Sequence, residues 1–165
     1  MHKSWLHEGG ISSPMIVHWP KGIQDKNKLR HNPAHLVDVL PTLVQLAGGN
    51  AAERSSPKAP ERPGKSLAAV LHKDGTAPHE YLYFNHNSNR ALRVGNQKLV
   101  SIGENGPWEL YDLASDRCEQ NNLASQQADT VRTMAATWKA HDDAFVRDRE
   151  SATETTKLRM RTVVR

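Results

Sequence analysis

The sequence predicts an α/β protein in two parts: a strand–helix unit, followed by a small four-stranded antiparallel sheet packed on a C-terminal helix. Three observations lead to this prediction. An apolar run at residues 14–19 precedes a helical repeat at residues 36–47. Four short segments with strand character follow one another between residues 81 and 113. Residues 125–147 then carry an apolar stripe at helical spacing.

The first part is predicted to contain a buried strand and a helix. The run from Pro14 to Trp19 is apolar and bounded by prolines, which is typical of a strand inside a parallel sheet. Asp38 is expected to cap the helix, and Pro41 fits its first turn, where backbone N–H groups lack partners anyway. The pair Gly48-Gly49 ends the helix. Its apolar positions are Leu36, Val39, Leu40, Leu43, Val44 and Ala47.

The second part is predicted to be an antiparallel meander covered by a helix. A loop at residues 51–64 and a short helix ending at Leu71 lead into it. Its strands are expected at residues 81–85, 90–94, 97–102 and 108–113. Gly95-Asn96 suits a hairpin turn that needs positive φ. The covering helix would use the stripe Val131, Met134, Ala135, Trp138 and Phe145.

The composition favours a segment whose core is completed by contacts with a partner domain. Of the 165 residues, 37% are hydrophobic, and the net charge is +4. Basic residues are scattered among acidic ones in most segments, so we do not expect nucleic-acid binding. Only Lys157 to Arg165 concentrates basic residues, and we expect residues 150–165 to be a basic flexible tail. The single cysteine, Cys118, excludes an intrachain disulfide, and no membrane-length apolar run occurs.

Four motifs, in order along residues 3–147, resemble the C-terminal portion of the sulfatase family. They are KSWLHEGGISSPMIVHWP from Lys3, VDVLPTLVQLAG from Val37, NHNSNRALRVGNQKLV from Asn85 and PWELYDLASDRCEQNNLA from Pro107. The resemblance is to arylsulfatases of the alkaline-phosphatase-like superfamily. It implies that residues 1–79 are the last strand–helix unit of the catalytic α/β domain. Residues 80–149 would then be the C-terminal sheet-and-helix subdomain.

The first motif carries the catalytic residue that the resemblance implies. Lys3 stands where the family has a lysine that contacts the sulfate ester, and an ammonium there would stabilise charge on the sulfuryl oxygens. Glu8 would be structural and hold the Gly9-Gly10 turn. Ser12 stands where many members have arginine. Formylglycine, formed in a C/S-x-P/A-x-R context, and the calcium ligands would lie before Lys3. We therefore expect the chain alone to be inactive and to bind no calcium specifically.

The third motif carries the substrate contacts that the resemblance implies. His86, Asn89 and Arg90 would meet the substrate beyond its sulfate, because their side chains offer the donors and acceptors that sugar hydroxyls need. Alternatively, Asn89 and Arg90 only tie the sheet to the main domain. Ser88 replaces a family glycine and Gln97 a family tryptophan. In the fourth motif, Arg117 stands where the family often has proline. Its residues Tyr111, Asp112 and Asn122 are expected to stabilise a turn.

Two functional hypotheses follow. In the first, the chain is the C-terminal part of a sulfatase acting on sulfate esters, with sulfated carbohydrates and the N-terminal catalytic half as partners. Such an enzyme would be periplasmic or secreted, by the resemblance. In the second, the chain is a stand-alone non-catalytic binding module or a degenerate sulfatase remnant. On the first hypothesis, residues 1–75 are expected to exchange amide protons quickly or aggregate, and residues 80–147 to be protected.

Overall fold

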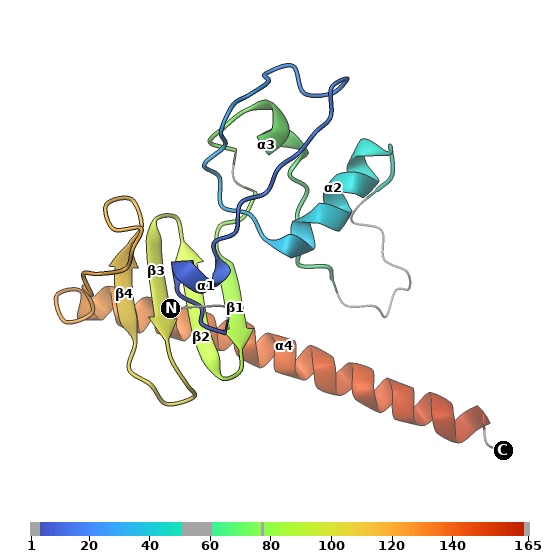
Figure 1. Cartoon of the computed structure of the whole chain (residues 1–165). Helices are drawn as coiled ribbons and strands as arrows, with labels where there is room; N and C mark the ends of the chain where they lie inside the picture. Colours follow the sequence, from blue (N-terminus) through green and yellow to red (C-terminus); the bar gives the residue numbers. More distant parts are fainter. Residues whose placement is uncertain (1–3, 51–60, 77, 164–165) are drawn as a thin grey trace. The chain divides into compact units, whose positions relative to one another are not determined.

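The computed structural model describes residues 4–50, 61–76 and 78–163, and of residues 152–163 only the backbone. Figure 1 shows the whole chain. The described residues fall into two compact units. The first unit, here called the sheet unit, contains the described residues up to Ser12 together with those from Tyr83 onward. The second unit runs from Ser13 to Leu82. Each unit is considered by itself.

The predicted helix of the second unit is confirmed, but it begins differently from the prediction. A 3₁₀ turn, η1 (Leu36–Asp38), leads directly into α2 (Val39–Leu46). His35 caps the turn, because its side chain accepts a hydrogen bond from the N–H of Val37. The predicted cap, Asp38, instead accepts the N–H of His35 at 2.8 Å from inside the first turn. The helix ends at Leu46, and Gly48, as expected, terminates the run with a φ of 79°, the left-handed conformation that glycine tolerates.

The predicted short helix is confirmed as α3 (Ala68–His72). Asp38 joins the start of α2 to residues on either side of α3. Its carboxylate is fully buried. One oxygen accepts the N–H of Lys65 at 2.9 Å and lies 2.7 Å from Nε2 of His79. Gly64 is required beside it, since a Cβ there would lie 2.1 Å from the carbonyl oxygen of Val37. A polar centre, rather than the apolar stripe, therefore holds this unit together.

The predicted buried strand from Pro14 to Trp19 is wrong in this structure. These residues form no strand, and their apolar side chains are exposed, Ile16 to 93%. A parallel strand needs neighbours to take its backbone hydrogen bonds. The described residues between 13 and 81 include no such strand. The apolar stripe of η1 and α2 is also exposed at Leu36, Leu40 and Leu43, and so is Leu46 at the end of α2.

The predicted four-stranded sheet is confirmed. Its strands are β1 (Leu82–His86), β2 (Asn89–Val94), β3 (Gln97–Ser101) and β4 (Glu109–Asp112), in the order β1-β2-β3-β4. Antiparallel register places Leu92 opposite Leu99, and Leu99 opposite Leu110. Gly95 has the expected positive φ of 57°. Asn87 and Ser88 also have positive φ, 49° and 63°, which makes the β1–β2 turn a tight two-residue hairpin.

The two faces of the sheet have different covers (Figure 1). Residues 4–12, which include α1 (Glu8–Ile11), cover one face. The core between them comprises Leu6, Ala91, Val100, Tyr111 and Leu113. The long helix α4 (Ala128–Val163) covers the other face, with Met134 and Trp138 buried. The covering helix was predicted to end near residue 147, but its backbone continues to residue 163. No helix in the described part of the chain is long and apolar enough to cross a membrane.

The fold refines the expectation for hydrogen exchange in the 165-residue chain. Amides of β2 and β3 should exchange slowest, since the side chains of Ala91, Leu92, Leu99 and Val100 are fully buried. Residues 4–12 should share that protection, because they close the same core. Amides of α2 should exchange faster, since its apolar stripe is exposed. Exchange mass spectrometry measures this, and equal protection of α2 and β3 would contradict it.

Candidate functional site

The segment that follows Lys3 is fastened to one face of the sheet. Lys3 itself lies outside the described residues, but Ser4 is held by Asn89, whose Nδ2 donates to the Ser4 carbonyl at 2.9 Å. The amide oxygen of Asn89 accepts the N–H of Gly103 at 2.9 Å. Asn89 thus joins the residue after Lys3 to the turn that follows β3.

A buried ion cluster holds the same segment at Glu8. Lys98 on β3 is fully buried, and its Nζ lies 3.0 Å from Oε1 of Glu8 and 2.9 Å from Oε1 of Glu119. The second oxygen of Glu119 accepts the backbone N–H of Glu8 at 2.7 Å. A buried charge is tolerated only when partners replace water around it. Lys98 therefore depends on both carboxylates, and they depend on Lys98.

Arg117 completes the charge balance at the surface. Its guanidinium donates to Oε2 of Glu8 and to Oγ of Ser12, both at 3.2 Å. Ser12 and Arg117 are the two positions where the first and fourth motifs depart from the sulfatase resemblance. Glu8 is structural, as expected, but its side chain bonds to these cations. The Gly9-Gly10 turn is closed by backbone bonds, including Gly10 N–H to the carbonyl of His7 at 2.8 Å.

His7 forms a second fastening point beside the cluster. Its side chain is 2% exposed, and its Nε2 lies 3.0 Å from Oε2 of Glu109. The hydroxyl of Tyr111 donates to the same oxygen at 2.7 Å. Burial, together with this bond to Glu109, raises the pKa of Tyr111, so the phenol stays protonated and remains a donor at neutral pH.

The structure places two of the three predicted substrate residues, His86 and Asn89, on one face of the sheet. Strand alternation puts His86 on the same face as Phe84, which packs against the core beneath residues 4–12. Asn89 lies on that face too, bonded to Ser4. His86 is exposed, and its ring nitrogen lies 3.1 Å from Nδ2 of Asn87.

Arg90 lies on the opposite face of the sheet, beside α4. Its guanidinium stacks 4.4 Å from the ring centre of Trp108 and lies 5.7 Å from that of Trp138. It also donates to Oγ of Ser101 at 2.8 Å and to the carbonyl of Gly106 at 3.0 Å. These contacts join β2, β3 and α4, so the structure does not bring Arg90 together with His86 and Asn89.

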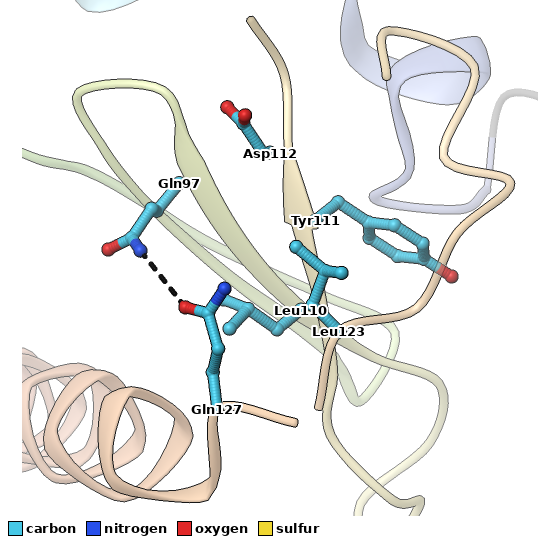
Figure 2. Close-up of a pocket in the computed structure, with 6 residues that line it drawn as sticks. All are labelled: Gln97, Leu110, Tyr111, Asp112, Leu123 and Gln127. Carbon is cyan, nitrogen blue, oxygen red and sulfur yellow. Dashed lines mark hydrogen bonds between the residues drawn. The ribbon is translucent and has the colours of Figure 1, made fainter. Parts of the chain in front are cut away.

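A shallow hollow lies on the α4 side of the sheet, at the start of that helix (Figure 2). Gln97 and Gln127 lie across it, with Nε2 of Gln97 donating to Oε1 of Gln127 at 3.5 Å. Figure 2 shows the ring of Tyr111 turned away from this amide pair. The lining residues are Gln97, Leu110, Tyr111, Asp112, Leu123 and Gln127. None of the predicted site residues lines this hollow.

The described residues do not offer a calcium site. Within the part of the chain that the structure describes, no three His, Cys, Asp or Glu side chains gather where a metal ion could bind. The two closely placed carboxylates, Glu8 and Glu119, are both paired with Lys98. Lys98 and Arg117 already balance the two negative charges, so this donor set does not suit a divalent cation.

The ion cluster was not predicted from the sequence, although its members lie in three of the motifs. Glu8 belongs to the first motif, Lys98 to the third and Glu119 to the fourth. A usable signal was Lys98 itself, a lysine inside the apolar strand QKLVS. The turn-stabilising role of the fourth motif is confirmed for Asp112 and Asn122, whose oxygens accept the N–H groups of Ala114 and Ala124.

Comparison with known proteins identifies the class to which this fold and these motifs belong. The family model described as "N-sulphoglucosamine sulphohydrolase, C-terminal" matches residues 1–141. The chain therefore belongs to this family: it is the C-terminal region of a sulfatase, related to the arylsulfatases. The predicted resemblance is confirmed.

Individual relatives agree with this assignment. A sulfatase of Formosa agariphila is 27% identical over 146 residues, which cover 76% of this chain and 25% of the relative. The N-acetylgalactosamine-6-O-sulfatase of Bacteroides thetaiotaomicron is 26% identical over 143 residues, 78% of this chain and 27% of that protein. The chain thus spans about a quarter of the length of these relatives. The crystal structure of Ps i-CgsB matches with a TM-score of 0.58 at 19% identity, over 74% of this chain and 27% of that one, which supports the fold alone.

The turn that carries Glu119 should be sensitive to acid. The backbone N–H groups of Asn121 and Gln120 donate to the carboxylate of Asp116, and these bonds lower its pKa below the usual 3.8. Because the folded-state pKa is lowered, the stabilisation is complete above pH 3.8 and is lost as the pH falls through the lower folded value. NMR titration of the Gln120 and Asn121 amides should therefore show a midpoint below 3.8. The transition should vanish in Asp116→Asn, whereas a midpoint at or above 3.8 would contradict the assignment.

Proposed function

We propose that this chain is the C-terminal part of a sulfatase that hydrolyses sulfate esters of carbohydrates. In this proposal Lys3 contacts the sulfate, and His86 and Asn89 form part of the substrate pocket. The observation that carries it is the fastening of residues 4–12 to the sheet face that bears His86 and Asn89. The bond from Asn89 to Ser4 puts a candidate substrate residue one position from Lys3 along the chain.

The chemistry assigned to Lys3 follows from charge. Hydrolysis of a sulfate ester builds negative charge on the sulfuryl oxygens and on the leaving oxygen. A fixed ammonium group stabilises that charge more in the transition state than in the ground state, provided that it does not have to move into place. A lysine whose neighbouring backbone is held at Ser4, His7 and Glu8 meets this requirement better than one on a free end.

The nucleophile and the calcium site belong, in this proposal, to the N-terminal part of the enzyme. Calcium would act there as a Lewis acid, and formylglycine as the nucleophile. The chain by itself is then inactive, because one electrostatic contact does not replace nucleophilic and metal catalysis. The carbohydrate class is supported by the relative named as an N-acetylgalactosamine-6-O-sulfatase.

The partner for the second unit is, we propose, the same N-terminal part. Leu36 on η1 is 83% exposed, and Leu40 and Leu43 on α2 are also exposed. Exposed apolar stripes of this kind mark surfaces that another part of a protein covers. The apolar residues 15–17 and Trp19, which lack strand neighbours here, would pair in the same assembly.

The proposal is tested by comparing the 165-residue chain with a longer polypeptide that includes the coding sequence upstream of it. The longer protein should hydrolyse an aryl sulfate, and the 165-residue chain should not. Lys3→Ala in the longer protein should lower kcat/KM by about 10²- to 10³-fold, the usual effect of losing one group that stabilises transition-state charge. Lys28→Ala, at an exposed lysine, is the matched control and should leave the rate unchanged.

Two results would contradict the proposal. Turnover by the 165-residue chain, abolished by Lys3→Ala, would remove the need for an N-terminal part. Equal activities of Lys3→Ala and Lys28→Ala would remove the role of Lys3. An upstream sequence without a C/S-x-P/A-x-R motif in any frame would favour the stand-alone binding module or remnant instead.

A further inference from the structure

We propose that Lys98 and Glu119 are positioning residues, whose buried contacts with Glu8 fix residues 4–12 on the sheet and thereby fix Lys3. The anchoring itself rests only on the contacts in this unit. Its consequence for Lys3 rests on the proposed function. Neither residue would touch the substrate.

Lys98 and Glu119 hold both the side chain and the backbone of Glu8. The ammonium group of Lys98 pairs with the Glu8 carboxylate at 3.0 Å. Glu119 accepts the Glu8 backbone N–H at 2.7 Å with one oxygen and pairs with Lys98 at 2.9 Å with the other. The three groups contact one another in a closed triangle. If Glu8 moved away from the sheet, its own carboxylate and the ammonium group of Lys98 would lose their mutual ion pair.

The single helical turn in this segment needs contacts outside itself. α1 is a single turn of four residues, and a helix this short is unstable by itself. The N–H of Glu8 lies in its first turn, where no backbone partner exists, and Glu119 supplies the missing acceptor. Glu119 is itself held in an uncommon conformation, with φ of 55°. Its turn is closed by the bonds from Gln120 and Asn121 to Asp116.

The distance along the chain from this anchor to Lys3 is short. Lys3 lies five residues before Glu8, and three residues between them are tied down separately. Ser4 is bonded to Asn89, Leu6 is buried in the core, and His7 is paired with Glu109. Lys98 is the most buried of the charged groups involved, so its pairing is the contact whose loss the segment tolerates least.

The first experiment measures amide hydrogen exchange by NMR in the 165-residue chain. Glu119→Gln keeps the size of the side chain but removes the charge that Lys98 needs, and Lys98→Met removes the cation. Both should raise the exchange rates of Glu8, Gly10 and Ser12 by at least about 100-fold, while Leu99 and Val100 in β3 remain protected in Glu119→Gln. The control Lys139→Met breaks an exposed ion pair with Asp143 on α4 and should change none of these rates.

Unchanged exchange at Glu8, Gly10 and Ser12 in Glu119→Gln would overturn the anchoring, whether or not Lys98→Met folds. Uniform loss of protection across residues 4–12 and β3 in Glu119→Gln would also overturn it, because the cluster would then support the whole sheet.

The second experiment tests the consequence for Lys3 in the longer, active polypeptide. Glu119→Gln should lower kcat with little change in KM, since it disturbs the placement of Lys3 and not the sugar contacts. Added to Lys3→Ala, it should cause no further loss of kcat, because the group that it positions is already gone. Fully additive losses would overturn the positioning role. If Lys3→Ala alone has no effect, the proposed function fails, while the exchange experiment still decides the anchoring.

Discussion

The attachment of residues 4–12 to the sheet depends on the charge of one buried side chain, Lys98. Its ammonium group has no access to water, and its two partners, Glu8 and Glu119, come from segments 90 residues before it and 21 residues after it. Removing one partner from such a cluster typically costs about 3–5 kcal/mol, because an uncompensated charge stays buried. The cluster therefore holds the segment at residues 4–12 and the turn at residues 117–121 against β3. Through this interaction the antiparallel sheet holds residues 4–12, the segment that follows Lys3.

The two faces of the sheet bind different segments of the chain. The face under residues 4–12 carries Asn89, Glu109 and Lys98, which fasten the candidate catalytic segment. The other face carries Arg90, stacked on Trp108 and surrounded by the contacts that attach α4. Consecutive residues of one motif, Asn89 and Arg90, thus serve opposite faces, as strand alternation requires. At the surface, Arg117 bonds to Ser12, so the two positions that depart from the sulfatase motifs contact each other.

Much of the fold could be predicted from the sequence, because its signals are local. A few neighbouring residues are enough to recognise the alternation of side chains in a strand or the positive φ of Gly95. The same is true of the apolar stripe that includes Met134 and Trp138. The prediction of a strand at residues 14–19 was wrong because a strand forms only beside strands that take its backbone hydrogen bonds. The described residues of that unit include no such neighbour. The ion cluster was missed because no short sequence pattern reports that Glu8, Lys98 and Glu119 meet in space.

The most direct test of this account is ¹H–¹⁵N NMR of the lysine side chains of the 165-residue chain at neutral pH. Lys98 should give a resolved ammonium signal that exchanges slowly with water and shows nuclear Overhauser contacts to the side chains of Glu8 and Glu119. Such a signal requires a charged amine that is buried and hydrogen-bonded. If the Lys98 protons instead exchange as fast as those of the exposed Lys139, the buried cluster does not exist in solution, and residues 4–12 must be held in some other way.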